Sequence, residues 1–267
     1  MRRRTFTVVG AVLCWMAATA VASPSAGQRT TVASARVKGG KVAYVQKAHE
    51  RWRDGRIISI ETEFVDPAGQ TIARRSVHFG DTPLVPTETY EDLRTGYRTE
   101  SRSLAGGAVE IKARKAKDEY TDRKVLRCKY QAVNAAGVVE AIRTHWAKLI
   151  AGGRIDISLI VPQRLDWYHF RLRKTATGRR SGKATTTFVL EPDNGLLRAI
   201  AGQLYFEFDD ETGGLARYRG QVDVHDEDGD PLQIDIAWSG AMPGAKPVVA
   251  APPAGTSAGT PAEPKAP

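Results

Sequence analysis

One short segment carries the richest set of aromatic and ionisable side chains in the chain: Leu165, Asp166, Trp167, Tyr168, His169 and Phe170. Side chains alternate between the two faces of a β-strand, so Trp167 and His169 would share one face. Asp166, Tyr168 and Phe170 would share the other. On a curved sheet one face lines a concavity, where it could grip a ligand or carry a dispersed catalytic site. The alternative is a purely structural role, in which one face of this strand packs into the core and the other face lies in solvent.

Signatures of several large enzyme classes are absent from the sequence. There is no G-x-S-x-G elbow, no S-x-x-K, no H-E-x-x-H and no P-loop, and no C-x-x-C pair is present. These absences disfavour several hydrolase classes. They leave open an enzyme whose site is assembled from Asp166, Tyr168 and His169 with a partner from another strand.

Histidine side chains can bind metal ions, and two of the five could lie close together. His49 and His78 lie on predicted strands that could be neighbours, but neither forms a short ligand motif such as H-x-H. Polar histidines on strand faces are therefore favoured, and we predict neither a metal site nor a cofactor. His145 stands beside Trp146 at the border of a predicted helix stripe, where packing at the helix edge is the favoured role.

Two groups of basic residues could draw the protein to an anionic envelope surface through their summed field. The first comprises Lys112, Arg114, Lys115, Lys117, Arg123, Lys124, Arg127 and Lys129. The second comprises Arg171, Arg173, Lys174, Arg179, Arg180 and Lys183. A solvated strand face with acidic partners such as Asp118, Glu119 and Asp122 explains the first group equally well. We expect no nucleic-acid partner, because no recognisable stacking motif is present.

The densest acidic cluster comprises Asp223, His225, Asp226, Glu227, Asp228 and Asp230. A calcium loop of the EF-hand type needs glycine at its sixth position and glutamate at its twelfth. Counted from Asp226, Gly229 falls at the fourth position instead. Predicted strands flank the cluster, so the pattern favours a hairpin turn.

Both ends of the chain are predicted to lie outside the fold. Residues 1–22 have a basic start, an apolar run and a small-x-small site, which is typical of a cleaved secretory signal; an uncleaved anchor is the alternative. Removal of Arg2, Arg3 and Arg4 lowers the net charge from +9 to +6. Residues 23–40 are predicted to be a loose leader, and residues 240–267 a disordered Pro/Ala/Gly-rich tail. We therefore expect a periplasmic or secreted protein with no transmembrane span in the mature chain.

Removal of the signal also leaves Cys128 as the single thiol of the mature chain, so no internal disulfide is possible. Alternation places its side chain opposite Arg127 and Lys129. A buried small hydrophobe is favoured over a catalytic thiol, which would need a histidine nearby.

Residues 41–239 are predicted to form a single β-rich domain, because the dominant period of the sequence there is two. About ten strands follow one another, and turn sequences such as Asp54-Gly55 and Asp66–Gly69 join the first of them into hairpins. Thr87–Arg102 is predicted to be one of the strands. Leu196–Ala201 is a short ambiguous element.

One helix interrupts this pattern. Its apolar stripe recurs at helical spacing and comprises Val138, Val139, Ile142, Trp146, Leu149 and Ile150. So many strands should curl around such a helix. The predicted fold class is mainly β: a large curved antiparallel sheet, either a half-barrel or a barrel, with one packed amphipathic helix.

Three segments, Asp66–Gly69, Asp92–Tyr97 and His145–Trp146, resemble an uncharacterised family of exported bacterial β-rich proteins. Glu191–Asn194 and the hairpin Tyr218–Gly229 fit the same layout. The resemblance implies a β-rich fold over most of residues 41–238 and carries no activity. The order of elements is also similar to that of the lipoprotein-carrier half-barrels of the bacterial periplasm, which is a likeness of architecture alone.

Three function classes follow. The first is a non-enzymatic binder that holds a lipid or another apolar or amphipathic molecule between the curved sheet and its helix. Its candidate ligand contacts are Trp146, Trp167, Tyr168, His169 and Phe170. The second is the dispersed enzyme, and the third is an envelope interaction module with a basic working surface. An apolar concavity would favour the binder, whereas converging ionisable groups would favour catalysis.

Overall fold

The computed structural model describes residues 26–193, 202–226 and 228–238. The predicted signal, the predicted tail and the ambiguous element Leu196–Ala201 lie outside the described residues. No helix in the described ranges is long and apolar enough to cross a membrane.

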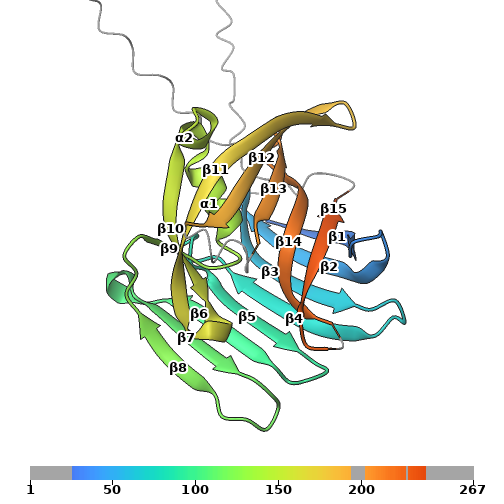
Figure 1. Cartoon of the computed structure of the whole chain (residues 1–267), viewed down its shortest axis with the longest axis vertical. Coiled ribbons are helices and arrows are strands. Elements are labelled where there is room, and N and C mark those ends of the chain that lie inside the picture. Colours follow the sequence, from blue (N-terminus) through green and yellow to red (C-terminus); the bar gives the residue numbers. More distant parts are fainter. Residues whose placement is uncertain (1–25, 194–201, 227, 239–267) are drawn as a thin grey trace, which may run out of the picture.

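Fifteen strands form one sheet (Figure 1). The first eight are β1 (Gly27–Arg36), β2 (Val42–Arg53), β3 (Arg56–Val65), β4 (Thr71–His78), β5 (Thr87–Asp92), β6 (Arg98–Ser103), β7 (Val109–Arg114) and β8 (Asp122–Leu126). The others are β9 (Gln131–Val133), β10 (Arg154–Val161), β11 (Asp166–Arg180), β12 (Lys183–Pro192), β13 (Leu204–Asp209), β14 (Leu215–His225) and β15 (Pro231–Ala237). Two single-turn 3-10 segments, Ala105–Gly107 and Pro162–Arg164, connect strands.

The strand order follows the chain in two runs, from β1 to β8 and from β9 to β15. Strands β1 and β15 join the two runs, and they pair antiparallel only at Ala35 with Ile236 and Arg36 with Asp235. All neighbours are antiparallel except β9 and β10. The edges of the sheet are β8 and β9, so the sheet is open and curved. This confirms the predicted fold class, with more strands than expected.

Turn chemistry explains why consecutive strands form hairpins. Asp54 and Gly55 both have positive φ, 52° and 72°, and join β2 to β3 through a two-residue turn. Ser181 and Gly182 do the same between β11 and β12, with φ of 48° and 82°. Such turns match the right-handed twist of the strands that they connect.

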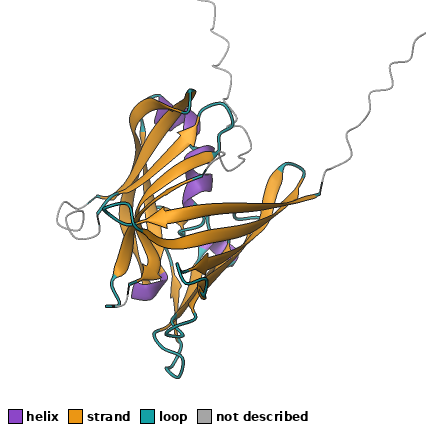
Figure 2. Ribbon diagram, turned by 90° about the vertical axis from the view of Figure 1, so that its right-hand side faces the viewer, coloured by secondary structure: helices purple, strands orange, loops and turns teal. Residues whose placement is uncertain are grey.

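The helix forms, but it is interrupted. The backbone leaves the helical region at His145 (φ −104°, ψ 15°), so α1 (Val138–Thr144) and α2 (Trp146–Ile150) replace the single predicted helix. Most of the predicted apolar stripe packs on the inner face of the sheet, although Ile150 is exposed. Figure 2 shows both helices inside the bend of the sheet.

Two sequence predictions about strands were wrong. Within the expected loose leader, Gly27–Arg36 forms β1, which pairs along its whole length with β2. Its inward side chains, Thr31, Ala33 and Ala35, are too small to give an apolar signal. Thr87–Arg102 is not one strand: Gly96, at φ 74°, turns the chain between β5 and β6.

The core consists of three clusters. One lies between the helices and the β10–β14 side, and it includes Trp146, Phe188 and Phe208. A second lies where β1 and β2 meet β14 and β15. The third contains Ile111 and Leu126 from one side of the sheet opening and Ile160 from the other. Side chains therefore pack across the opening that backbone pairing leaves.

Candidate functional site

The inner face of the sheet encloses a cavity of about 400 Å³. Strands β2 to β5 contribute Ala48, Ile60, Phe64 and Tyr90 to its wall, the opposite strands contribute Phe170, Tyr218 and Ile236, and α1 contributes Val138 and Val139. Ile60, Thr62 and Phe64 alternate along β3, and all three line this cavity. Its volume lies in the range of about 300–1,000 Å³ that is usual for small-molecule sites.

A charged cluster interrupts the apolar wall. Arg75 on β4 lies with its Nε 3.3 Å from Oε1 of Glu88 on β5, and its Nη2 donates to Asp223 on β14. The guanidinium also lies over the rings of Phe64 and Tyr90, 5.9 and 5.6 Å from their centres. Asp223 reaches inward where the pairing of β14 with β15 is irregular, between Gln221 and His225.

Burial and ion pairing have opposite effects on the pKa values of Arg75 and Glu88. Burial raises the pKa of Glu88 above its ordinary value, although Arg75 acts in the opposite direction. Burial also acts to lower the pKa of Arg75, but the carboxylates of Glu88 and Asp223 outweigh it, and the net change is upward. The guanidinium therefore stays charged while Glu88 gains a proton more readily than a solvated glutamate.

One donor at this cluster has no hydrogen-bond partner within the described part of the chain: Oη of Tyr90, a residue that is only 1% exposed. Nε of Arg75 makes no well-directed hydrogen bond either, but the carboxylate of Glu88 lies 3.3 Å from it. Burial raises the pKa of Tyr90, so the phenol keeps its proton. The neighbouring Tyr218 differs, because its hydroxyl donates to the carbonyl of Gln221. Buried polar groups are normally hydrogen-bonded, so the hydroxyl of Tyr90 on the cavity wall is an exception that calls for an explanation.

Of the five predicted ligand contacts, only Phe170 lines the cavity. Trp146 packs in the core, 5.0 and 5.7 Å from the ring centres of Phe188 and Phe208. Tyr168 packs against the same cluster, whereas Trp167 packs against the cluster at the sheet opening. Side chains alternate between the two faces of β11 as predicted, but of these five residues only Phe170 borders the cavity.

His169 lies away from this cavity. Its ring stacks on Tyr130 with centres 4.2 Å apart; Nε2 lies 3.0 Å from Asp156 Oδ1, and Nδ1 lies 3.5 Å from Asp193 Oδ2. Asp166 lies instead 3.7 Å from the amine of Lys124. The three residues of the dispersed enzyme hypothesis are thus not brought together, since Tyr168 points to the opposite face from His169.

Cross-strand carboxylates neutralise most of the two predicted basic groups. Lys112 lies 3.0 Å from Glu100, and Arg114 lies 3.4 Å from Glu91. Arg171 and Arg173 share Glu191, and Arg180 binds Glu207 with both of its forked nitrogens. Arg179 bonds to the carbonyl of Gly182, and Lys115 is exposed without an ion pair in the described ranges. These carboxylates lie one or two strands away in the sheet rather than nearby in sequence.

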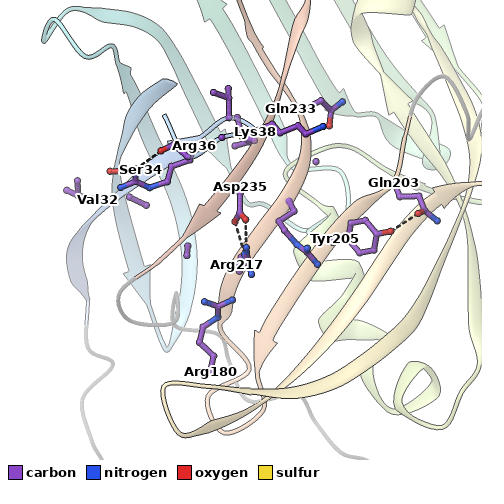
Figure 3. A pocket seen from close by; sticks show the side chains of 18 residues that line it. Val32, Ser34, Arg36, Lys38, Arg180, Gln203, Tyr205, Arg217, Gln233 and Asp235 are labelled. Carbon is purple, nitrogen blue, oxygen red and sulfur yellow. Dashed lines mark hydrogen bonds and ion pairs between the residues drawn. The ribbon is translucent and has the colours of Figure 1, made fainter. Parts of the chain in front are cut away.

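The outer face of the sheet carries a groove of about 910 Å³, which the sequence did not predict (Figure 3). It lies over β1, β14 and β15, and its charged lining residues are Arg36, Lys38, Arg180, Arg217, Arg219 and Asp235. Arg180 belongs to the second predicted basic group, whereas the other charged residues of the groove come from other parts of the chain and were in neither predicted group.

The acidic cluster near the end of the fold forms a hairpin turn at Asp226, Asp228 and Asp230, as predicted, and Glu227 lies outside the described residues. Oδ1 of Asp226 accepts hydrogen bonds from the backbone N–H groups of Asp228 and Asp230. Asp223 instead faces the cavity.

Across the described ranges, no three His, Cys, Asp or Glu side chains are grouped so that they could hold a metal ion. His49 bonds to Thr30, and His78 lies beside Ser76 and Glu61. His145 contacts Gln131, and Cys128 is half-buried at the sheet opening.

Comparison with protein-family models, with curated proteins and with solved structures finds no match. The resemblance to the family of exported β-rich proteins therefore stays a prediction.

Proposed function

We propose that the protein is an exported, non-enzymatic binder that holds an apolar or amphipathic molecule in the cavity inside its curved sheet. The observation that carries this proposal is the cavity itself. Its wall is mostly apolar and comes from both runs of the sheet and from α1, and beside its charged cluster the hydroxyl of Tyr90 has no hydrogen-bond partner among the described residues. A mostly apolar pocket with a few convergent polar groups is typical of small-molecule sites.

The charged cluster suggests which end of a ligand would lie there. Oη of Tyr90 can donate a hydrogen bond to a ligand, whereas Nε and Nη2 of Arg75 already lie beside the carboxylates of Glu88 and Asp223. A second anion would be repelled by Glu88 and Asp223, so a neutral oxygen such as a carbonyl or a hydroxyl suits the place better. The rest of the ligand would lie against Ile60, Phe170 and Ile236.

Binding is favoured over catalysis for two reasons. No histidine or cysteine is among the described residues that line the cavity. The ionisable groups of the cluster are also held by one another, and Glu88 accepts a further hydrogen bond from the backbone N–H of Ala136. Such groups stabilise a wall and orient a ligand, and among the described lining residues there is no histidine or cysteine to serve as the base or the thiol nucleophile of acyl transfer.

Narrowing the cavity tests the proposal. Ala48→Phe adds a ring to the β2 wall, whereas Ala147→Phe adds the same ring on the exposed side of α2. Titration of the full chain with N-phenyl-1-naphthylamine, whose fluorescence rises in apolar surroundings, reports on binding. We expect saturable binding by the wild type and by Ala147→Phe, and binding weakened by about ten-fold or more in Ala48→Phe. Equal binding by both variants, with far-ultraviolet circular dichroism unchanged, would contradict the proposal.

A further inference from the structure

We propose that the outer groove over β1, β14 and β15 is a second binding site, and that it takes a ligand bearing phosphate groups. This second site is separate from the cavity, and the proposal does not depend on which ligand the cavity holds. Its lining is almost entirely distinct from that of the cavity, since the two share Ile234 alone.

The way in which the two runs of the sheet meet creates the groove. Strands β1 and β15 pair only at Ala35 and Arg36, and β1 continues to pair with β2 away from that point. Along β14, Tyr218 points into the molecule while Arg217 and Arg219 line the outer face. Lys38 comes from the turn that follows β1. Figure 3 shows Arg36, Lys38 and Arg217 around the hollow.

The charges in the groove do not balance. Arg217 is bonded to Asp235 through both of its forked nitrogens, and Arg180 is bonded in the same way to Glu207. Three further cations, Arg36, Lys38 and Arg219, line the groove, and no carboxylate of the described residues forms an ion pair with them.

The excess of positive charge acts on the neighbouring carboxylates. The hydrogen bond from Arg217 lowers the pKa of Asp235, and the more distant charge of Arg219 lowers it further. The pKa of Glu207 is lowered in the same way by its bond to Arg180, with Arg219 again contributing. The groove therefore presents a positive field to an incoming anion.

The guanidinium groups of two of these cations are held in place. The guanidinium of Arg219 lies 5.2 Å from the centre of the Tyr205 ring, and the Tyr205 hydroxyl donates to Gln203. Arg36 donates to the carbonyl of Gly40 at 2.8 Å. Guanidinium forks match the oxygens of phosphate, and a lysine amine adds a point charge. A phosphorylated soluble molecule and a phospholipid headgroup share this chemistry.

The test compares two pairs of neutralising substitutions that change the net charge equally. Lys38→Gln with Arg219→Gln removes charge from the groove, whereas Lys115→Gln with Lys117→Gln removes it from an exposed turn outside the groove. Each full chain is titrated calorimetrically with inorganic tripolyphosphate. Each is also sedimented with phosphatidylcholine vesicles with and without phosphatidylglycerol. Lys38→Gln alone, on an exposed turn, keeps the test valid if the double variant fails to fold.

We expect the groove variant to bind tripolyphosphate, or vesicles containing phosphatidylglycerol, about ten-fold more weakly, with the control variant unchanged. Loss with tripolyphosphate alone would assign the site to a soluble phosphate compound, and loss with vesicles alone to a lipid headgroup. Equal weakening in both variants would show an effect of net charge only and would overturn the proposal. Absence of wild-type binding to both probes would overturn it as well.

Discussion

Arg75 lies between two carboxylates in a mostly apolar part of the cavity wall. Its neighbour Arg74 points outward, with a side chain 62% exposed and a single ion pair to Glu63 at 3.6 Å. The two arginines therefore test opposite faces of one strand.

We expect Arg75→Gln to lower the free energy of unfolding by about 3–5 kcal/mol, because Glu88 and Asp223 would be left facing each other. Arg74→Gln should change it by less than about 0.5 kcal/mol. Urea unfolding of both variants measures the difference. A similar small effect at both positions would show that the buried cluster does not hold the wall together.

Tyr90 carries the unpaired donor, and Tyr90→Phe removes only that hydroxyl. Two ligands of nearly equal shape distinguish the hydrogen bond of this hydroxyl from apolar packing. 2-Acetylnaphthalene has a carbonyl acceptor, and 2-ethylnaphthalene has none. We expect the variant to bind the ketone about five- to ten-fold more weakly, the effect of one lost hydrogen bond, and the hydrocarbon unchanged. Displacement of N-phenyl-1-naphthylamine measures both affinities, and an equal change for both ligands would remove Tyr90 from the polar end of the site.

Glu50 makes stability depend on pH. It is 1% exposed, its Oε2 accepts from the indole of Trp52 at 3.1 Å, and its Oε1 has no partner among the described residues. Burial raises its pKa above the ordinary value of 4.5, against the Trp52 hydrogen bond, which lowers it. The protonated form is thus favoured in the folded state, and this stabilisation is lost as the pH rises through the raised pKa.

We therefore expect Glu50→Gln to gain stability relative to the wild type as the pH rises above about 4.5, with no such gain below it. Glu119→Gln, at an exposed position, should show no trend. Unfolding in urea between acidic and neutral pH measures the difference at each step. A gap between Glu50→Gln and the wild type that stays constant with pH would contradict the assignment.

At the scale of elements, local turn chemistry made much of the fold predictable. Asp54-Gly55 and Asp226–Gly229 each specify a turn within a few residues, so the hairpins could be predicted from the sequence. The strand β1 could not, because its inward residues are small. The charged cluster of the cavity could not either, since Arg75 and Asp223 are 148 residues apart in sequence and meet only when the two runs of the sheet come together.

The start of α1 depends on a close approach of two loops. Asn134 donates through Nδ2 to the carbonyl of Pro86 at 2.8 Å and to the hydroxyl of Ser101 at 2.9 Å. Its Oδ1 accepts from the backbone N–H of Gly137, and a Cβ at Gly137 would overlap the carbonyl of Leu84.

We expect Gly137→Ala to cost about 2 kcal/mol or more, because the loop or the helix must move to make room. Gly80 has open space around its Cβ position, so Gly80→Ala should cost much less. Thermal unfolding of both variants tests this. Equal midpoints would mean that the approach of the two loops is not tight.

At the scale of the whole molecule, the cavity exists because two runs of strands curve around one helical segment. Pairing of β1 with β15 joins the runs on one side, and the packing of Ile111 and Leu126 with Ile160 joins them on the other. Neither run alone contains the lining of the cavity, which draws on both. A ligand that binds in the cavity would therefore stabilise the folded protein, because only the folded protein, with both runs joined, can bind it.

Native mass spectrometry of the full chain, purified gently from its host beside Ala48→Phe, tests the central claim most directly. We expect the wild type to carry a reproducible extra mass that organic extraction releases, and Ala48→Phe to lack it. The same bare mass for both proteins would contradict the account of the cavity as a ligand site.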